Sequence, residues 1–320
     1  MHKTEKKSAP RHRVNYVKKY GIHYVGIAPF FALFFAFIAV PLVQGIAMSF
    51  TDWSTRLRGG THFTGLENYI YLFTSGGTSS TRFLKSLKNL AIYVPTTILI
   101  GMSMALLLAL LVSQYRGRFY SFLRGTFYIP TVLPLYLCAG IWQWYLNGEG
   151  GLVASMLSSV GIGRNINWIY TSGYAIAVCV IVDVWHATGF NFVILSAGIQ
   201  NISPEYYEAS EIDGASIWQQ MRYITIPLLE PVLFFVVTYG FISALQVYDI
   251  PRILTADTDI NALGGPNQVM LFPVMEMVRN VYNGDKAGLG RACAEGVILM
   301  GIILLITAFQ FARRRKNKER

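Results

Sequence analysis

The sequence predicts an all-α integral membrane protein with six transmembrane helices. Composition and the placement of charge both lead to this class. Of the 320 residues, 53% are hydrophobic and 14% are charged, whereas soluble domains usually carry about 25% charged residues. A soluble fold would have to bury nearly all of that excess apolar surface, and a bilayer removes the requirement. The basic residues gather mainly at the two ends of the chain, with long apolar stretches between them.

Six apolar stretches reach the length of about 20 residues that a membrane span needs. They lie at about 24–50, 89–113, 127–146, 174–199, 227–250 and 292–312. The first is too long for a signal peptide and has no obvious small-residue cleavage site, so we expect it to remain as the first span. Prolines in the first three spans predict kinks, which either serve ordinary packing or build a bundle around a polar path. These prolines are Pro29, Pro41, Pro95, Pro130 and Pro134.

The basic residues predict the orientation of the spans. With the N-terminus inside, the segments 1–23, 114–126, 200–226 and 313–320 face the cytoplasm and hold 17 of the 27 Lys and Arg residues. Positive charge near spans is retained on the cytoplasmic side. The chain therefore divides into a basic cytoplasmic tail at 1–23, a transmembrane domain at 24–312 and a basic cytoplasmic tail at 313–320. No base-stacking or groove-reading pattern accompanies the charge, so nucleic-acid binding is not indicated.

Several kinds of site have no support in the sequence. Cys138, Cys179 and Cys293 lie in apolar segments, with no CxxC or Cys/His cluster. They are expected to be small hydrophobic helix residues, and neither a metal site nor a disulfide framework is predicted. No Gly-Lys pair occurs, so the chain lacks the phosphate-binding loop that an ATPase needs. We expect no catalytic residue and no bound cofactor.

The segment 199–227, IQNISPEYYEASEIDGASIWQQMRYITIP, is more than a linker. Ser203, Pro204 and Glu205 form a helix start, with a side-chain acceptor, a proline in the first turn and an acid at the positive helix end. The pattern predicts a helix over 204–213, which Gly214 ends in the left-handed conformation. A second helix follows, and we expect it to end at Pro227. One face of that helix should carry Ile217, Met221 and Ile224.

The charge of this loop runs against its expected location. Glu205, Glu208, Glu211 and Asp213 stand against Arg222, a net charge of −3 in a segment expected to face the cytoplasm. Such a loop is either a solvated amphipathic segment or a knob for a partner protein whose cleft has a basic rim.

The same segment resembles the EAA loop of ABC importer permeases. That pattern is Glu-Ala-Ala, three residues, Gly, nine residues, then Ile-x-Leu-Pro. Here it stands as Glu208-Ala209-Ser210, Gly214 and Ile224-Thr225-Ile226-Pro227, with both spacings intact. Serine replaces the second alanine and isoleucine replaces the leucine. The surrounding YEASEIDGAS and ITIPLL are similar to the carbohydrate-uptake branch, which includes the maltose and glycerol-3-phosphate permeases.

The resemblance covers about residues 25–312. It includes SFTDW at 49–53, FTGLENY at 63–69, RGTFYIPTVLP at 124–134 with the GIWQWYLNGEGGL that follows, INW at 166–168 and VDVWHATGFN at 182–191. The last outer loop departs from the family, because LTADTDINALGGP stands where members often have LTGGGP. The entry to the last span, GLGRACAEG, also differs from the usual GYASA-like form.

The resemblance implies a type I ABC importer permease in the cytoplasmic (inner) membrane of a bacterium. It implies a second homologous permease subunit, two ABC ATPase subunits that bind ATP and Mg, and an extracellular solute-binding protein. The coupling loop at 200–227 would seat in a cleft of one ATPase. Its expected contact residues are Glu208, Ala209, Ser210, Asp213, Gly214, Ile224 and Pro227. Glu208 would pair with an arginine, and Gly214 would set the helix angle.

Polar and aromatic residues in the fourth and fifth spans are candidates for the substrate path, because polar groups inside a membrane are costly. These candidates are His186, Phe190, Asn191, Tyr239, Ser243 and Gln246. Helical spacing places His186 and Phe190 on one face, and the three residues of the fifth span on another. Aromatic faces and hydroxyls suit a sugar. The same residues would equally serve to hold helices together, and for Asp183 a structural role is favoured.

Two alternatives remain at this point. An ion-gradient-driven secondary transporter would need carboxylates in a relay, and the spans offer only Asp183 and Asp249, without a visible repeat. An importer of glycerol phosphate or a polyol is the other. A phosphate would call for Lys or Arg inside the fourth and fifth spans, which have none, so a neutral sugar of undetermined length is favoured.

Overall fold

The computed structural model describes residues 16–54, 61–74, 76–113, 117–147, 150–161, 166–255, 262–283 and 287–318. Most of the predicted tail at 1–23, part of the tail at 313–320 and residues 256–261 of the unusual LTADTDINALGGP stretch lie outside these residues. The chain forms two compact units, 1–47 and 48–320. Among the described residues the only β pairing is a bridge between Thr51 and Phe63.

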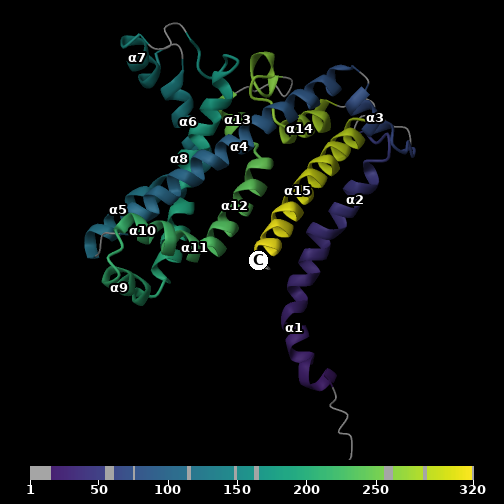
Figure 1. Ribbon diagram of the computed structural model, residues 1–320. Coiled ribbons are helices and arrows are strands. Elements are labelled where there is room, and N and C mark those ends of the chain that lie inside the picture. The colour runs from purple at the N-terminus through teal and green to yellow at the C-terminus, as the bar shows by residue number, and fades with distance from the viewer. Residues whose placement is uncertain are drawn as a thin grey trace, which may run out of the picture. The chain divides into compact units, whose positions relative to one another are not determined.

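The described elements are nearly all helical (Figure 1). In chain order they are α1 Tyr16–Phe34, a π turn Phe35–Ala39, α2 Val40–Met48, α3 Glu67–Thr74, α4 Thr78–Val112, α5 Gly117–Val132, α6 Leu135–Leu146, α7 Leu152–Ser159, α8 Tyr174–Gln200, α9 Pro204–Ile212, α10 Ile217–Gln220, a π turn Met221–Thr225, α11 Ile226–Leu228, α12 Glu230–Leu245, α13 Asp249–Thr255, a 3-10 turn Pro266–Gln268, α14 Pro273–Asn283 and α15 Gly288–Lys318.

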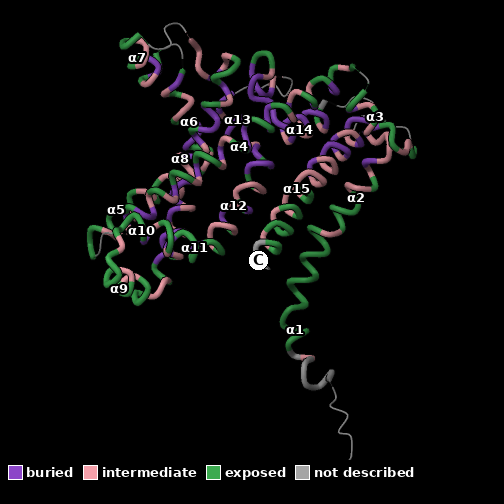
Figure 2. Tube along the Cα trace, viewed as in Figure 1, coloured by how far each residue is buried: buried purple, intermediate pink, exposed green. Residues whose placement is uncertain are grey.

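The first unit is one apolar helical rod made of α1, the π turn and α2. Its apolar stretch His23–Met48 runs for 26 residues, in agreement with the first predicted span, and its most apolar part has no buried residue. Figure 2 shows this rod exposed along almost its whole length. Stacked phenylalanines cover part of it, such as Phe30 against Phe34 with ring centroids 6.4 Å apart. A surface of this kind belongs in lipid or against another membrane helix.

The second unit is built around α4 and α8, which pack along each other. Their contact carries much of the main buried cluster, including Leu90 and Tyr93 of α4 and Cys179 and Val182 of α8. Gly101 of α4 faces Val184 of α8, and a Cβ there would make an ordinary contact at 3.6 Å with the valine side chain. This pair, with α12 packed on both, sets the position of the candidate site.

Within the described parts of the chain, four helices are long and apolar enough to cross a membrane alone: His23–Met48, Thr78–Val112, Tyr174–Gln200 and Gly288–Lys316. They correspond to the first, second, fourth and sixth predicted spans. The third and fifth predicted spans are each broken. The kink predicted in the third span is present at Pro134, where α5 and α6 meet at an angle of 88°. Pro134 has no N–H for the preceding turn, so the helix ends before it and a new one begins.

The fifth predicted span breaks later than expected. Pro227 was expected to separate it from the loop, but Pro227 lies inside α11 near its first turn, where a proline is tolerated. The break falls at Leu229, and the segment Ile217–Leu228 makes an angle of 67° with α12. The helix also stops at Leu245, and residues 249–255 form the separate helix α13.

A buried polar cluster joins α4, α14 and α15, and the sequence analysis missed it. Arg82 Nε donates to Glu276 Oε1 at 2.9 Å, and Arg279 Nη1 donates to Glu276 Oε2 at 2.6 Å. Asn280 Nδ2 donates to Glu295 Oε1 at 2.8 Å. We call these five residues the polar cluster. Burial lowers the pKa of the Arg279 guanidinium while the Glu276 carboxylate opposes that change, and an arginine stays protonated under both influences.

Candidate functional site

The loop at 200–227 folds as two short helices joined by a glycine turn. α9 begins after Ser203 and ends at Ile212, and Gly214 has a φ of +76°, the left-handed conformation predicted for it. One expectation is wrong: the Ser203 side chain makes no capping hydrogen bond. The first turn is closed by the backbone instead, since the Tyr206 N–H donates to the Ser203 carbonyl at 3.2 Å.

The second helix carries the side-chain cap. The Ser216 N–H donates to Gln219 Oε1 at 2.7 Å, and the Gln219 N–H donates to Ser216 Oγ at 3.4 Å. This reciprocal arrangement is a capping box. The sequence analysis missed it, although the pattern Ser-x-x-Gln at 216–219 is a recognisable signal for it.

Buried polar side chains tie the two helices together across the turn. The hydroxyls of Tyr207 and Thr225 lie 3.0 Å apart, and Gln220 Nε2 donates to Ser210 Oγ at 2.9 Å. Ser210 in turn donates to the Tyr207 carbonyl at 2.8 Å. Gln220 and Thr225 are both buried. The serine that replaces an alanine of the EAA pattern therefore links α9 to α10 through hydrogen bonds.

Much of this loop is exposed (Figure 2), and its exposed residues include both acids and large apolar side chains. Glu208, Ala209, Asp213, Gly214 and Pro227 are exposed and Ile224 is half-buried. Nearby apolar side chains are also open, with Ile212 88% and Trp218 72% exposed. Of the three residues predicted to share an inner face, Ile217 is exposed, while Met221 and Ile224 are half-buried.

The loop is connected to α12 through a buried pivot. Leu229, at the break, is 1% exposed and packs in a cluster with Phe192, Leu195 and Val236. Gly198 of α8 lies opposite, where a Cβ would approach Leu229 Cδ1 to 2.6 Å. Because residue 198 is a glycine, it leaves room for the Leu229 side chain. Leu229 is therefore the buried junction between the loop and the first turn of α12.

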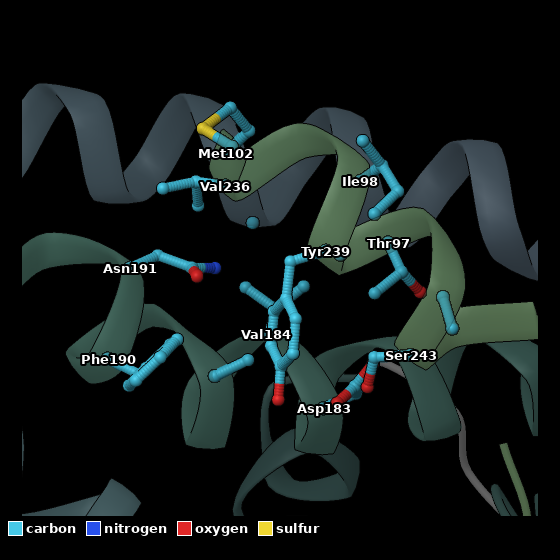
Figure 3. A pocket seen from close by; sticks show the side chains of 14 residues that line it. Thr97, Ile98, Met102, Asp183, Val184, Phe190, Asn191, Val236, Tyr239 and Ser243 are labelled. Atoms are coloured by element: carbon cyan, nitrogen blue, oxygen red, sulfur yellow. The ribbon is translucent and has the colours of Figure 1, made fainter. Parts of the chain in front are cut away.

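A small cavity lies between α4, α8 and α12 (Figure 3). Its volume is about 70 Å³. Four of the six predicted path residues line it: Phe190 and Asn191 from α8, and Tyr239 and Ser243 from α12. Tyr239 reaches across the cavity in Figure 3, and its ring lies 5.8 Å from that of Phe190. Asp183 also lines the cavity and accepts a 2.7 Å hydrogen bond from the Tyr93 hydroxyl.

The other two predicted path residues lie elsewhere. His186 Nε2 is 3.3 Å from the Leu133 carbonyl oxygen, at the break between α5 and α6. That break leaves a carbonyl without a helical donor, and a polar side chain from the neighbouring helix satisfies it. Gln246 is exposed just beyond the end of α12, and its N–H donates to the Ser243 carbonyl at 3.1 Å.

A larger cavity of about 630 Å³ lies between α4 and the first half of α8. Its polar lining includes Lys85, Lys88, Asn89 and Thr96. The Lys85 ammonium donates to the Asn267 carbonyl, while Lys88 is exposed. Ligand sites usually measure about 300–1,000 Å³, so this cavity has the volume of a ligand site and the small one does not. The sequence analysis searched only the fourth and fifth spans for basic groups and therefore missed both lysines.

Comparison with known proteins gives consistent matches along the chain. A family model described as "Binding-protein-dependent transport system inner membrane component" matches residues 97–317. A probable ABC transporter permease of Pyrococcus horikoshii is 30% identical over 287 residues, covering 88% of this chain and 91% of its own length. The trehalose/maltose transport system permease of Thermococcus litoralis is 30% identical over 300 residues, covering 92% and 94%.

A solved structure has the same fold. A chain of the bacterial alginate ABC transporter, in complex with an alginate pentasaccharide-bound periplasmic protein, superposes with a TM-score of 0.76 at 22% identity. The superposition covers 96% of this chain and 98% of the other. The predicted all-α fold of a type I ABC importer permease is confirmed by this likeness.

Proposed function

This chain belongs to the family of binding-protein-dependent transport system inner membrane components, and from that premise we propose that it forms half of the path by which an ABC importer brings a carbohydrate into the cell. Family membership makes it a multi-pass membrane permease of an importer. The ion-gradient-driven alternative finds no support in the comparisons. The carbohydrate is favoured by the relatives, among them permeases for trehalose/maltose and for lactose.

The loop at 200–227 carries the proposal. Its two helices are joined by hydrogen bonds, its exposed residues include Glu208 and open apolar side chains, and the buried Leu229 connects it to α12. This arrangement suits a body that fits into a cleft of a partner and transmits the partner's movement. We call it the coupling loop. It would face the cytoplasm, with both chain termini on the same side.

The proposed assembly needs subunits that this chain does not provide. Two ABC ATPase subunits would bind ATP and Mg²⁺ and supply the energy, because the chain has no phosphate-binding loop of its own. A second homologous permease would complete the path, and an extracellular solute-binding protein would deliver the sugar. Glu208 would pair with an arginine of the ATPase cleft.

Closure of the ATPase pair would move the coupling loop about Leu229 and displace α12 against α4 and α8. α12 carries Tyr239 and Ser243, so its movement changes the small cavity directly. At about 70 Å³ that cavity is far below the roughly 300–1,000 Å³ of a ligand site, so it does not admit a sugar in this conformation. A sugar would pass only when α12 withdraws, with the rings of Phe190 and Tyr239 against its C–H faces.

An acidic saccharide is a second candidate substrate. The larger cavity adds Lys85 and Lys88 near the path, and its lining contains no acidic residue. The neutral sugar was favoured only because the fourth and fifth spans lack basic residues. The solved relative in the alginate transporter comes from an importer of an acidic polysaccharide, which agrees with such a role for these lysines.

Co-purification tests the coupling loop. The chain would be expressed with its neighbouring permease and an ATPase, as wild type and as Glu208→Ala, and ATPase retention in detergent would be measured. We expect loss of the ATPase from Glu208→Ala. The control is Glu211→Ala, which removes another exposed acid from the same helix at a position where the EAA pattern specifies no residue type, and it should retain the ATPase. Equal retention by both variants would contradict the proposed docking.

A further inference from the structure

The end of α15 is tied to the first turn of α12. Arg314 Nε donates to Glu230 Oε1 at 3.0 Å, and its Nη2 donates to Glu230 Oε2 at 3.3 Å. The same guanidinium lies 4.3 Å from the centroid of the Phe234 ring. That ring meets Phe311 edge-on at 4.9 Å. We call these four residues the α12–α15 clamp. Each helix contributes two residues one turn apart, so an ion pair and a contact between aromatic rings join the two helices side by side.

The clamp lies directly beside the pivot of the coupling loop. Glu230 is the first residue of α12 and follows the buried Leu229. The segment Ile217–Leu228 meets α12 there at 67°. A rotation of the coupling loop about Leu229 displaces the first turn of α12, and that turn holds the carboxylate to which α15 is bound.

α15 extends from the clamp to the polar cluster. As a helix of 31 residues it spans about 45 Å at 1.5 Å per residue. Near its other end Glu295 accepts the hydrogen bond from Asn280 of α14. Ala294 packs there against Leu72 and Phe83. A single rigid helix thus connects the coupling pivot with the segment that carries Glu276 and Arg279.

We propose that Glu230 and Arg314 are positioning residues that make α15 move with the coupling loop. The inference rests on the proposed function, because it requires a loop that an ATPase moves. An ion pair whose side chains are 49% and 23% exposed contributes little to stability. A carboxylate held by two guanidinium nitrogens is nevertheless directional, and the ring beneath the guanidinium restricts the pair further. Transfer of movement requires such a fixed geometry.

The experiment uses the whole transporter in nanodiscs, with this chain carrying spin labels at Glu205 of α9 and Lys316 of α15, both exposed. The distance between the labels is measured without nucleotide and after trapping with ATP and vanadate. In wild type we expect one narrow distance in both states, because α15 follows the loop. In Arg314→Ala the distance should shift and broaden on trapping, while the melting temperature stays that of wild type.

Two further variants complete the test. Arg313→Ala removes the same charge from an exposed neighbouring residue and should behave as wild type. The exchange Glu230→Arg with Arg314→Glu should restore the narrow distance. An Arg314→Ala protein that keeps the wild-type distance in both states would overturn the inference, as would an exchange that restores nothing. ATP hydrolysis by the wild-type complex is measured first. If the complex does not hydrolyse ATP, the proposed function itself is overturned, whatever the label distances are.

Discussion

The coupling loop and the polar cluster use charge in opposite ways. Glu208 and its acidic neighbours in the loop are exposed to solvent. In the polar cluster Glu276 and Arg279 are fully buried, and Arg279 Nη1 donates to Glu276 Oε2 at 2.6 Å. An exposed acid remains hydrated and can bind a partner protein. A buried charge has lost its hydration, and that cost has to be offset by an opposite charge and by hydrogen bonds. Mutation should therefore affect binding at the first region and folding at the second.

The largest expected effect is at Glu276. Glu276→Ala leaves the fully buried Arg279, and the mostly buried Arg82, without their carboxylate. Removing one partner of a buried pair costs about 3–5 kcal/mol of stability. We expect a strongly lowered melting temperature in detergent and a loss of monodisperse protein.

Two controls sharpen this prediction. Glu276→Met together with Arg279→Met removes both members of the inner pair, and it should recover part of the lost melting temperature because no buried charge is left alone. Glu208→Ala, at the exposed region, should melt as wild type. If Glu276→Ala also has the melting temperature of wild type, the polar cluster does not stabilise the fold more than the coupling loop does, and the contrast between the two regions is wrong.

A smaller effect is expected at Gly214, where the backbone rather than a charge matters. Gly214→Ala places a Cβ at a φ of +76°, which costs an L-residue about 1–2 kcal/mol. The strained turn changes the angle between α9 and α10, so ATPase affinity should fall about tenfold, a factor that corresponds to about 1.4 kcal/mol. Binding of purified ATPase to the chain in nanodiscs measures it.

Gly76→Ala is the matched control. Gly76 has a φ of +58° and, like Gly214, open space around the position of a Cβ. It precedes α4, away from the coupling loop in sequence. Both variants carry similar backbone strain, so equal losses of ATPase affinity would show that strain alone, and not the loop angle, is being measured.

The sequence was sufficient for what depends on apolar length and local spacing. Four spans appear as single long helices, and the left-handed Gly214 follows from its place after a helix. Tyr239 and Ser243 lie together in the small cavity because residues four apart share a helix face. These features depend on a few neighbouring residues and need no knowledge of the rest of the fold.

Features that depend on distant contacts were missed. The kink at Pro134 was predicted, but the angle of 88° between α5 and α6 was not, because a proline marks where a helix bends and not by how much. At that break His186 contacts the Leu133 carbonyl oxygen, and it does not line the small cavity as predicted. Glu276 and Arg279 are charged residues in a polar segment, which normally indicates a solvated surface. Only the packing of α4, α14 and α15 buries them.

The smallest expected effect separates two serines that look alike in the sequence. Both precede a helix of the coupling loop, but only Ser216 accepts a hydrogen bond from its own helix. Ser216→Ala should cost about 1 kcal/mol locally, which corresponds to about fivefold faster exchange of the α10 amide hydrogens. Ser203→Ala should leave exchange in α9 unchanged, because the backbone closes that turn. Faster exchange in α9 after the second substitution would instead support the capping role that the sequence predicted for Ser203.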